Sequence, residues 1–300
     1  MSAVALEVAR SGARGLRLPD GRCRPLPSWE PLHNSCTGCV FIIASGPSAA
    51  EFPIQRYADV PMIAMNGSIA CFEPAGLRPL FYLCDDAGVA EKKSTALASG
   101  IRLSRWSALS LESMQRLYER EPQSLEADSL LLMERVNRWI GVKRCSDRAF
   151  AWSARRDPDF VMRWSLFSQT ANRIGFSRNY ARGYFNARTI AYAAIQLAYY
   201  LGFAKVFLVG VDMDSSLGQF YDPAGTQVKS RLDGDFDGHI LPHFNILAQR
   251  VIGADFQVFN LSRDSRLPGE LIPKVSLAQV DDLIASTASQ PLAPEVGKLV

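Results

Sequence analysis

Four apolar runs in the sequence each end in a short group of small or polar residues. These groups are Ser45-Gly46-Pro47-Ser48, Asn66-Gly67-Ser68, Cys84-Asp85-Asp86 and Gly210-Val211-Asp212. Small residues let a backbone approach a ligand closely, and their exposed N–H groups can hold a phosphate. Four such groups together indicate a ligand site, although Gly-Pro is also ordinary turn chemistry. The nucleotide-binding motifs G-x-G-x-x-G and G-x-x-x-x-G-K-[ST] are absent from the sequence.

Further polar residues stand at the predicted start of a helix and after the last of these runs. Asn186 can cap that helix, and Thr189 would lie in its first turn, where free N–H groups favour an anion. An ordinary helix cap explains the same residues. Asp212 and Asp214 either bind a divalent metal or lie in a solvated loop.

The apolar runs have the lengths of strands and helices that alternate along the chain. Strands are predicted at Val40–Ala44, Met62–Met65, Leu80–Leu83, Val206–Val209 and Gln257–Phe259. Helical spacing predicts helices at Ala187–Leu201 and near Phe244–Ile252. This alternation favours an α/β fold with a mostly parallel sheet between helices. In such a sheet ligands bind beyond the carboxyl ends of the strands, where the polar groups fall.

The regular pattern occupies only part of the chain. Residues 1–38 are rich in Gly, Arg and Pro without periodicity, and residues 287–300 are polar and contain Pro. We expect a loosely structured N-terminal segment and a tail on either side of one domain, residues 39–286. Residues from about 105 to 182 match the strand–helix pattern poorly, which predicts an irregular or helical lid or acceptor subdomain.

The composition is that of a globular protein without a disulfide framework. Hydrophobic residues make up 48% of the 300 residues and charged residues 21%, and the net charge of +3 alone does not imply nucleic acid. Cys36 and Cys39 lack two further ligands at zinc spacing, so reduced thiols in a cytoplasmic protein are expected. The apolar stretch Thr189–Val211 is long enough for a membrane span, but Gly202 and Lys205 interrupt it.

Six segments, in chain order, carry a resemblance to a known family. They are IIASGPS, IAMNGS, LRPLFYLCDD, GYFNARTIAYAAIQLAYYLGFAKVFLVGVDM, QFYDPAGTQ and FNLSRDSRL. Together they resemble the lipopolysaccharide inner-core transferases that add a third residue of 3-deoxy-D-manno-octulosonic acid (Kdo). More distantly, they resemble bacterial sialyltransferases that use CMP-sialic acid. The resemblance implies a single GT-A-like, Rossmann-type domain that transfers Kdo from CMP-Kdo with inversion, and it implies no metal or other cofactor.

The resemblance also implies a donor-nucleotide site. Its residues would be Ser45, Gly46, Pro47, Ser48, Asn66, Gly67, Thr189, Gly210, Asp212 and Tyr221. Within this set, Asn66 matches an asparagine that touches the donor, and Asp212 matches an aspartate that holds the cytidine ribose. Tyr221 lies near family tyrosines that bind the leaving phosphate.

The general base is implied less directly. The sialyltransferases use a histidine in a loop before a helix, and His239 lies close to that position, with His243 nearby. The third-Kdo transferases have other residues at both places, so Asp86 is an alternative base. A histidine suits the role because an unperturbed imidazole titrates near neutral pH.

The middle of the chain is strongly basic and aromatic. From Arg135 to Arg188 there are twelve Lys or Arg residues against three Asp. The implied acceptor is a lipid A–core glycolipid, whose carboxylates and phosphates would pair with guanidinium groups. The residues expected to bind it are Arg155, Arg156, Arg163 and Arg182. With Trp152 and Trp164 at headgroup level, we expect peripheral contact with the inner face of the inner membrane and no nucleic-acid partner. A solvated cationic surface is the alternative.

Two other functions compete with Kdo transfer. A sialyltransferase-like enzyme would use another CMP-ulosonic acid, because donor choice depends on a pocket shape that sequence does not reveal. A non-catalytic module would bind RNA or anionic lipid through residues 135–188, although no RNA-binding motif is present.

Overall fold

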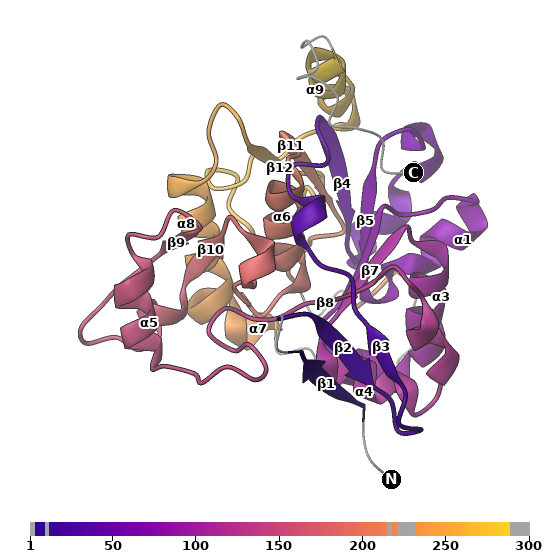
Figure 1. Ribbon diagram of the computed structural model, residues 1–300. Helices are drawn as coiled ribbons and strands as arrows, with labels where there is room; N and C mark the ends of the chain where they lie inside the picture. Colours follow the sequence, from indigo (N-terminus) through magenta and orange to yellow (C-terminus); the bar gives the residue numbers. More distant parts are fainter. Residues whose placement is uncertain (1–3, 10–11, 215–217, 221–231, 289–300) are drawn as a thin grey trace.

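A seven-stranded sheet forms the centre of the molecule (Figure 1). The computed structural model describes residues 4–9, 12–214, 218–220 and 232–288. The strands, in their order across the sheet, are β12 (Gln257–Asn260), β11 (Lys205–Val209), β4 (Cys39–Ile43), β5 (Met62–Met65), β6 (Phe81–Cys84), β7 (Trp106–Leu109) and β8 (Leu130–Leu132). Every neighbouring pair is parallel. The predicted α/β domain with a mostly parallel sheet is confirmed.

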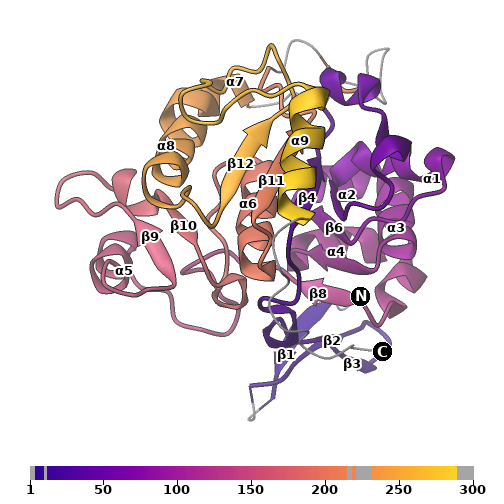
Figure 2. The same cartoon turned by 90° about the horizontal axis from the view of Figure 1, so that it is seen from above.

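Helices cover both faces of this sheet, which is why its strands are continuous apolar runs. The helices are α1 (Phe72–Ala75), α2 (Ala87–Lys92), α3 (Ser94–Leu103), α4 (Leu111–Tyr118), α5 (Asp147–Ala154), α6 (Ile190–Leu201), α7 (Leu232–Asp235), α8 (Leu241–Arg250) and α9 (Leu277–Ala288). Alternate residues of β4 enter two separate cores, with Val40 and Ile42 in one and Phe41 and Ile43 in the other. The first core includes α6 and α8, and the second includes α2, α3 and α4 (Figure 2).

The strand order reverses between β4 and β11, which makes the gap between their carboxyl ends the expected ligand crevice. Helix α6 runs antiparallel to these strands. The N–H of Cys36, just before β4, donates to the C=O of Leu201 at the end of α6 (2.8 Å). The opposite end of α6, beginning at Ile190, therefore lies at the carboxyl edge of the sheet.

The described part of the N-terminal segment, residues 4–9 and 12–38, contains regular structure, contrary to the expectation of a loosely structured segment. Strands β1 (Ala5–Val8), β2 (Arg14–Arg17) and β3 (Cys23–Pro25) form a separate antiparallel sheet. Leu16 and Trp29 are buried, and the Trp29 indole N–H donates to the C=O of Leu132 (2.8 Å). Gln115 of α4 donates to the C=O of Val4 (2.7 Å). These contacts attach the small sheet to the domain.

The segment between β8 and α6 projects from one side of the sheet (Figure 1). It starts later than predicted, because residues 106–132 form β7, α4 and β8 of the main sheet. It contains α5 and an antiparallel pair, β9 (Phe160–Met162) and β10 (Gly175–Ser177). A backbone bridge between Arg135 and Tyr184 joins the two ends of the segment. That it acts as a lid stays a prediction.

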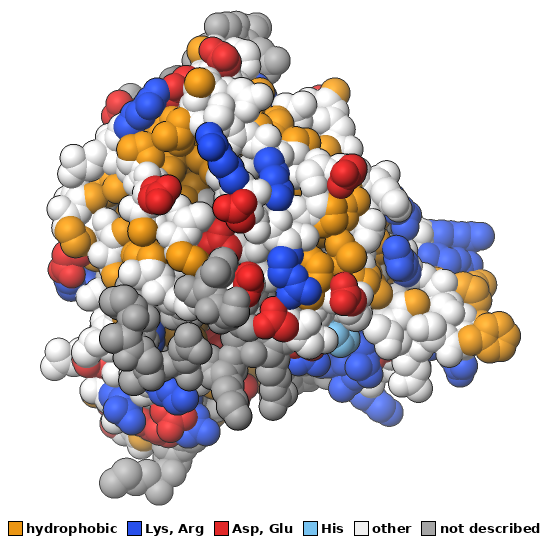
Figure 3. Space-filling view, turned by 180° about the vertical axis from the view of Figure 1, so that it is seen from behind, with side chains coloured by type: hydrophobic (Ala, Val, Ile, Leu, Met, Phe, Trp, Pro, Cys, Tyr) orange, Lys and Arg blue, Asp and Glu red, His pale blue; other side chains and the backbone are white. Residues whose placement is uncertain are grey.

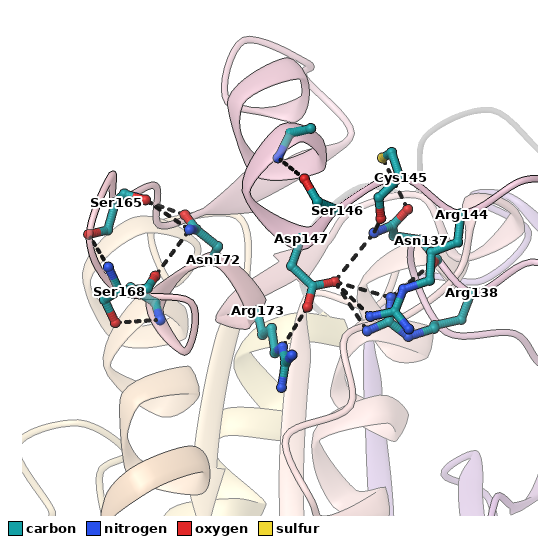
Figure 4. Close-up of polar contacts among 12 residues, drawn as sticks. Asn137, Arg138, Arg144, Cys145, Ser146, Asp147, Ser165, Ser168, Asn172 and Arg173 are labelled. Atoms are coloured by element: carbon teal, nitrogen blue, oxygen red, sulfur yellow. Dashed lines mark hydrogen bonds and ion pairs between the residues drawn. The ribbon is translucent and has the colours of Figure 1, made fainter.

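One carboxylate organises the cationic residues of this segment. Asp147, in the first turn of α5, forms ion pairs with Arg138, Arg144 and Arg173 (Figure 4). Burial acts to raise the pKa of Asp147, but the arginines outweigh it and lower the pKa below its usual value. Part of the cationic charge seen in the sequence is therefore neutralised within the protein.

Helix α9 extends to residue 288, and the rest of the predicted tail lies outside the described residues. Within the described ranges, none of the helices is both long enough and apolar enough to traverse a bilayer. The apolar stretch Thr189–Val211 forms the cap and body of α6, a turn and β11, as its interruptions predicted.

Candidate functional site

The turns that follow β4 and β11 pack directly on each other. The N–H of Gly46 donates to the C=O of Gly210 (2.9 Å), and the N–H of Ser48 donates to the Asp212 carboxylate (3.1 Å). A Cβ atom on Gly46 would lie 2.5 Å from the C=O oxygen of Gly210 and would clash with Asp212. Gly46 must therefore be small, because the turn after β11 packs against it.

A third turn, after β12, fixes the other two. The Ser262 hydroxyl contacts the Ser48 hydroxyl (2.7 Å) and accepts from the N–H of Val211 (3.0 Å). The N–H of Arg266 donates to the C=O of Asp212 (3.0 Å). Ser262 is fully buried. Ser262 lies in the segment FNLSRDSRL, where no local sequence pattern indicated a role for it.

Asn66 has the features of a ligand-binding residue. Its backbone is left-handed, with φ of 48°, and it opens the turn that follows β5. Its buried side-chain Oδ1 has no hydrogen-bond partner among the described residues. Left-handed strain in a non-glycine residue and an orphaned buried acceptor are both uncommon, and both gather at binding sites. Asn66 therefore presents an acceptor suited to an N–H or O–H group of a ligand.

A largely buried carboxylate, Asp85, follows the end of the adjacent strand, β6. Asp85 accepts two bonds from Arg135, at 3.0 Å from Nε and 2.8 Å from Nη2. It also accepts from the Tyr184 hydroxyl and from the Asn186 amide (3.2 Å). Because Met65 and Leu83 are register partners, Asp85 and Asn66 follow neighbouring strand ends. No local sequence pattern indicated an individual role for Asp85, Arg135 or Tyr184.

The electrostatics of this cluster keep Arg135 charged. Burial acts to lower the pKa of Arg135, but the negative charge of Asp85 outweighs it and raises the pKa. Burial and Asp85 both raise the pKa of Tyr184 well above its usual value, so Tyr184 stays a neutral donor. The Arg135 side chain is 47% exposed while its guanidinium is fixed by Asp85. This arrangement suits a planar anion, such as a carboxylate or a phosphate.

The N-terminus of α6 lies at the same carboxyl edge of the sheet as these residues. Thr189 is the N-cap, three residues after the predicted cap Asn186, and its side chain makes no capping bond. Asn186 does not cap the helix: its Oδ1 accepts from the N–H of Arg188 (2.7 Å), and its amide bonds Asp85. The partial positive charge of a twelve-residue helix is thus directed at the same edge.

The family model for "3-deoxy-D-manno-octulosonic acid transferase WaaZ" matches residues 32–278, which include all these strand ends. The chain belongs to this family. Two relatives carry the name "Probable 3-deoxy-manno-octulosonic acid transferase". The relative from Salmonella typhimurium LT2 is 25% identical over 245 residues, covering 81% of this chain and 88% of the relative. The relative from Escherichia coli K12 is 25% identical over 251 residues, covering 83% and 86%.

Membership of the WaaZ family confirms the resemblance seen in the sequence. The chain is a glycosyltransferase that adds Kdo in lipopolysaccharide core biosynthesis. Two solved structures are similar at a greater distance. The MAf glycosyltransferase from Magnetospirillum magneticum AMB-1 has 14% identity and a TM-score of 0.44, and the match covers 85% of this chain but only 38% of that one. The sialyltransferase CstII from Campylobacter jejuni, in complex with CMP-3FNeuAc, has 13% identity and a TM-score of 0.42 over 80% and 86%.

The two candidate histidines of this WaaZ-family chain, His239 and His243, have different environments. His243, in α8, is 1% exposed and packs edge-on against Tyr192 of α6. Its Nδ1 lies 2.6 Å from the C=O of His239, and burial lowers its pKa to about 4. A side chain so buried does not reach an acceptor hydroxyl. His239 lies in a π-helical turn, is 31% exposed and has Asp235 4.0 Å away. Of these two side chains, His239 is therefore the more accessible.

The structure shows the surroundings of two other predicted site residues of this WaaZ-family chain, Asp86 and Arg182. Asp86 caps α2, where its carboxylate accepts from the N–H groups of Gly88 (2.8 Å) and Val89 (3.2 Å). Arg182 is paired with Asp157 and Asp159 and is not free for an acceptor. Tyr221 lies outside the described residues.

The described part of this WaaZ-family chain holds no group of three or more His, Cys, Asp or Glu side chains that could bind a metal ion. A pocket of about 520 Å³ lies at the opposite, amino edge of the sheet, between Met62, Leu80 and Arg105. These residues begin β5 or precede β6 and β7. The pocket is therefore separate from the strand ends at which parallel sheets bind ligands.

Acid should destabilise this WaaZ-family chain through His243. Because its pKa is about 4 in the folded state against 6.5 in a model peptide, the unfolded chain binds the proton more tightly. The contribution of His243 to the free energy of unfolding is therefore fully present above pH 6.5. It is lost as the pH falls towards 4, and the loss is about 3 kcal/mol at most. His243→Gln should flatten this acid limb, as measured by denaturant unfolding at a series of pH values. Equal slopes for the two proteins would assign the acid limb to other groups.

Proposed function

We propose that the chain transfers Kdo from CMP-Kdo to the lipopolysaccharide inner core at the carboxyl edge formed by β4, β5, β6 and β11. The reaction is inverting and needs no divalent metal. The single observation that carries the site is Asn66, with its left-handed backbone and unpaired buried Oδ1. It supports a donor bound beside the α6 N-terminus and Arg135. The proposed nucleotide-binding residues are Ser45, Gly46, Pro47, Ser48, Asn66, Gly67, Thr189, Gly210, Asp212 and Tyr221.

The chemistry needs a stabilised leaving group and a base. The bond between the anomeric carbon of Kdo and a CMP phosphate oxygen breaks, and the acceptor oxygen bonds that carbon from the opposite face. Negative charge grows on CMP, where the α6 N-terminus and Arg135 would stabilise it. His239 takes the acceptor proton. Arg266 links the π-helical turn that contains His239 to the site. The backbone N–H of Arg266 donates to Asp212, and the Arg266 guanidinium lies 4.1 Å from the ring centroid of Phe236 in that turn.

The acceptor would approach from the projecting basic segment. Within the described part of the chain, Arg155, Arg156 and Arg163 make no ion pair, in contrast to Arg182. Their guanidinium groups suit the carboxylates and phosphates of a lipid A–core glycolipid. Such an acceptor is anchored in the inner membrane, so the enzyme would work in peripheral contact with its inner face.

Release of CMP tests this function directly. We expect CMP to form from CMP-Kdo only when Kdo-containing core glycolipid is present, and at an unchanged rate in excess EDTA. His239→Ala should lower turnover at least about tenfold. Free CMP and the mass of the glycolipid product are the readouts.

CMP-sialic acid serves as the comparison donor. Faster turnover with CMP-sialic acid than with CMP-Kdo would replace the proposed donor, and loss of activity in EDTA would contradict the metal-free mechanism. If His239→Ala retains full turnover, the base is another group.

A further inference from the structure

An exposed apolar patch lies at the tip of the projecting segment. Four large apolar side chains form it. The exposed fractions are 50% for Trp152, 40% for Trp164, 53% for Leu166 and 93% for Phe167. The rings of Trp152 and Trp164 are in contact, with centroids 4.9 Å apart. An almost fully exposed phenylalanine beside two half-exposed tryptophans is unusual on a protein surface, and such patches mark interaction sites.

The turn that carries Phe167 is held by side-chain hydrogen bonds. The Asn172 side chain, 3% exposed, accepts from the N–H of Ser165 (2.8 Å) and donates to the C=O groups of Ser165 (2.8 Å) and Ser168 (3.0 Å). The Ser165 hydroxyl accepts from the N–H groups of Phe167 (3.3 Å) and Ser168 (3.0 Å). Figure 4 shows this turn beside the Asp147 network. These hydrogen bonds fix the turn in the conformation that exposes Phe167.

Uncompensated cations surround the patch. Arg155 lies 3.2 Å from the Trp152 ring centroid, and Arg163 immediately precedes Trp164. Arg156 is exposed, and none of these three arginines makes an ion pair with another described residue. On this side of the molecule, Lys and Arg side chains gather around protruding hydrophobic ones (right of Figure 3). The patch thus combines apolar insertion with positive charge.

We propose that Trp152, Trp164, Leu166 and Phe167 form a membrane-docking patch that inserts into the headgroup region of an anionic bilayer. Aromatic side chains favour this region, and flanking arginines pair with lipid phosphates. The proposal deepens the function proposed above, because it names the surface that brings the enzyme to a lipid-anchored acceptor.

The size and charge of the patch favour a bilayer over a second copy of the chain. Its exposed apolar area is on the order of 500 Å², from the typical areas of such side chains. A stable dimer needs about 800 Å² on each partner. Two copies facing each other would also bring the same arginines together, whereas anionic lipids neutralise them.

Vesicle binding by the full chain tests the patch without any turnover. The probes are vesicles of phosphatidylethanolamine with phosphatidylglycerol, and vesicles of phosphatidylcholine alone. We expect wild-type protein to co-sediment with the anionic vesicles and only weakly with the neutral ones. Phe167→Ser should weaken binding about tenfold, since it removes the most exposed apolar group. Arg156→Gln should weaken it about fivefold, and only on anionic vesicles.

Val8→Ser is the matched control, since Val8 is 50% exposed on β1, in a different part of the chain. Its binding should equal that of wild type. Absence of wild-type binding to anionic vesicles, or equal loss in Val8→Ser and Phe167→Ser, would overturn the proposal. A wild-type dimer in sedimentation velocity that Phe167→Ser dissociates would assign the patch to self-association instead.

Turnover separates this proposal from the proposed function. Phe167→Ser should release CMP at the wild-type rate when the acceptor is a detergent-dispersed core glycolipid. Wild-type turnover without vesicle binding would end only the membrane proposal. Vesicle binding without CMP release would end only the proposed reaction.

Discussion

Arg135→Gln is expected to lower kcat/KM for CMP-Kdo by about 100-fold or more. Arg135 is fixed by two bonds to Asp85 while half of its side chain stays exposed, which pre-orients a cation for an anionic group of the donor. A charge-assisted pair of hydrogen bonds contributes about 3 kcal/mol, which corresponds to that factor. Steady-state CMP release gives the measurement. Arg135→Lys should recover only part of the activity. A lysine ammonium lacks the planar set of donors with which a guanidinium can bond Asp85 and the anionic group of the donor together.

Arg144→Gln is the control for this prediction. Arg144 lies in the same segment, is 50% exposed and also pairs with an aspartate, Asp147. It should retain activity within about twofold, since exposed ion pairs contribute little. Thermal unfolding of both variants separates lost catalysis from lost folding. If Arg135→Gln is folded and keeps its kcat/KM, the anion-binding role is wrong.

Gly46→Ala should disrupt the site by forcing apart the two turns that form it. The new Cβ would lie 2.5 Å from the Gly210 carbonyl oxygen and against the Asp212 carboxylate, so the turns after β4 and β11 must separate. Overpacking of this kind costs about 1–3 kcal/mol. We expect a loss of unfolding free energy at the upper end of that range, together with a large loss of turnover. Denaturant unfolding and CMP release measure the two effects.

Gly269→Ala provides the comparison, because nothing lies within 4 Å of a Cβ at that position. Its stability should stay close to that of wild type. Equal stability of Gly46→Ala and wild type would mean that the two turns separate without cost.

The main sheet could be predicted from the sequence because both of its faces are buried. The five residues of β4 are all buried, and this produces an uninterrupted apolar run that local pattern reveals. The small N-terminal sheet has no such signal. Its strands have three or four residues, and only Gly15 and Leu16 of them are fully buried.

Only those site residues that lie close to a predicted strand in the sequence could be predicted. Asn66 follows β5 directly and Asp212 follows β11 after two residues, so their place at the carboxyl edge came from the strand pattern. Asp85 and Arg135 are 50 residues apart, and no local pattern pairs them. His239 lies in a π-helical turn and is partly exposed, whereas His243 lies in the α-helix that follows and is buried. Sequence spacing does not reveal such a change of helix type.

The bridge between Arg135 and Tyr184 has an evolutionary consequence. The N–H of Val136 donates to the C=O of Tyr184, and the N–H of Tyr184 donates to the C=O of Glu134, both at 3.0 Å. The chain thus leaves and re-enters the sheet domain at one place. Insertions or deletions in the exposed part of the intervening segment, away from its packing on α6 and α8, would leave the strand order unchanged. Descendants of one ancestral enzyme could therefore acquire new glycan targets while retaining their activated-sugar chemistry.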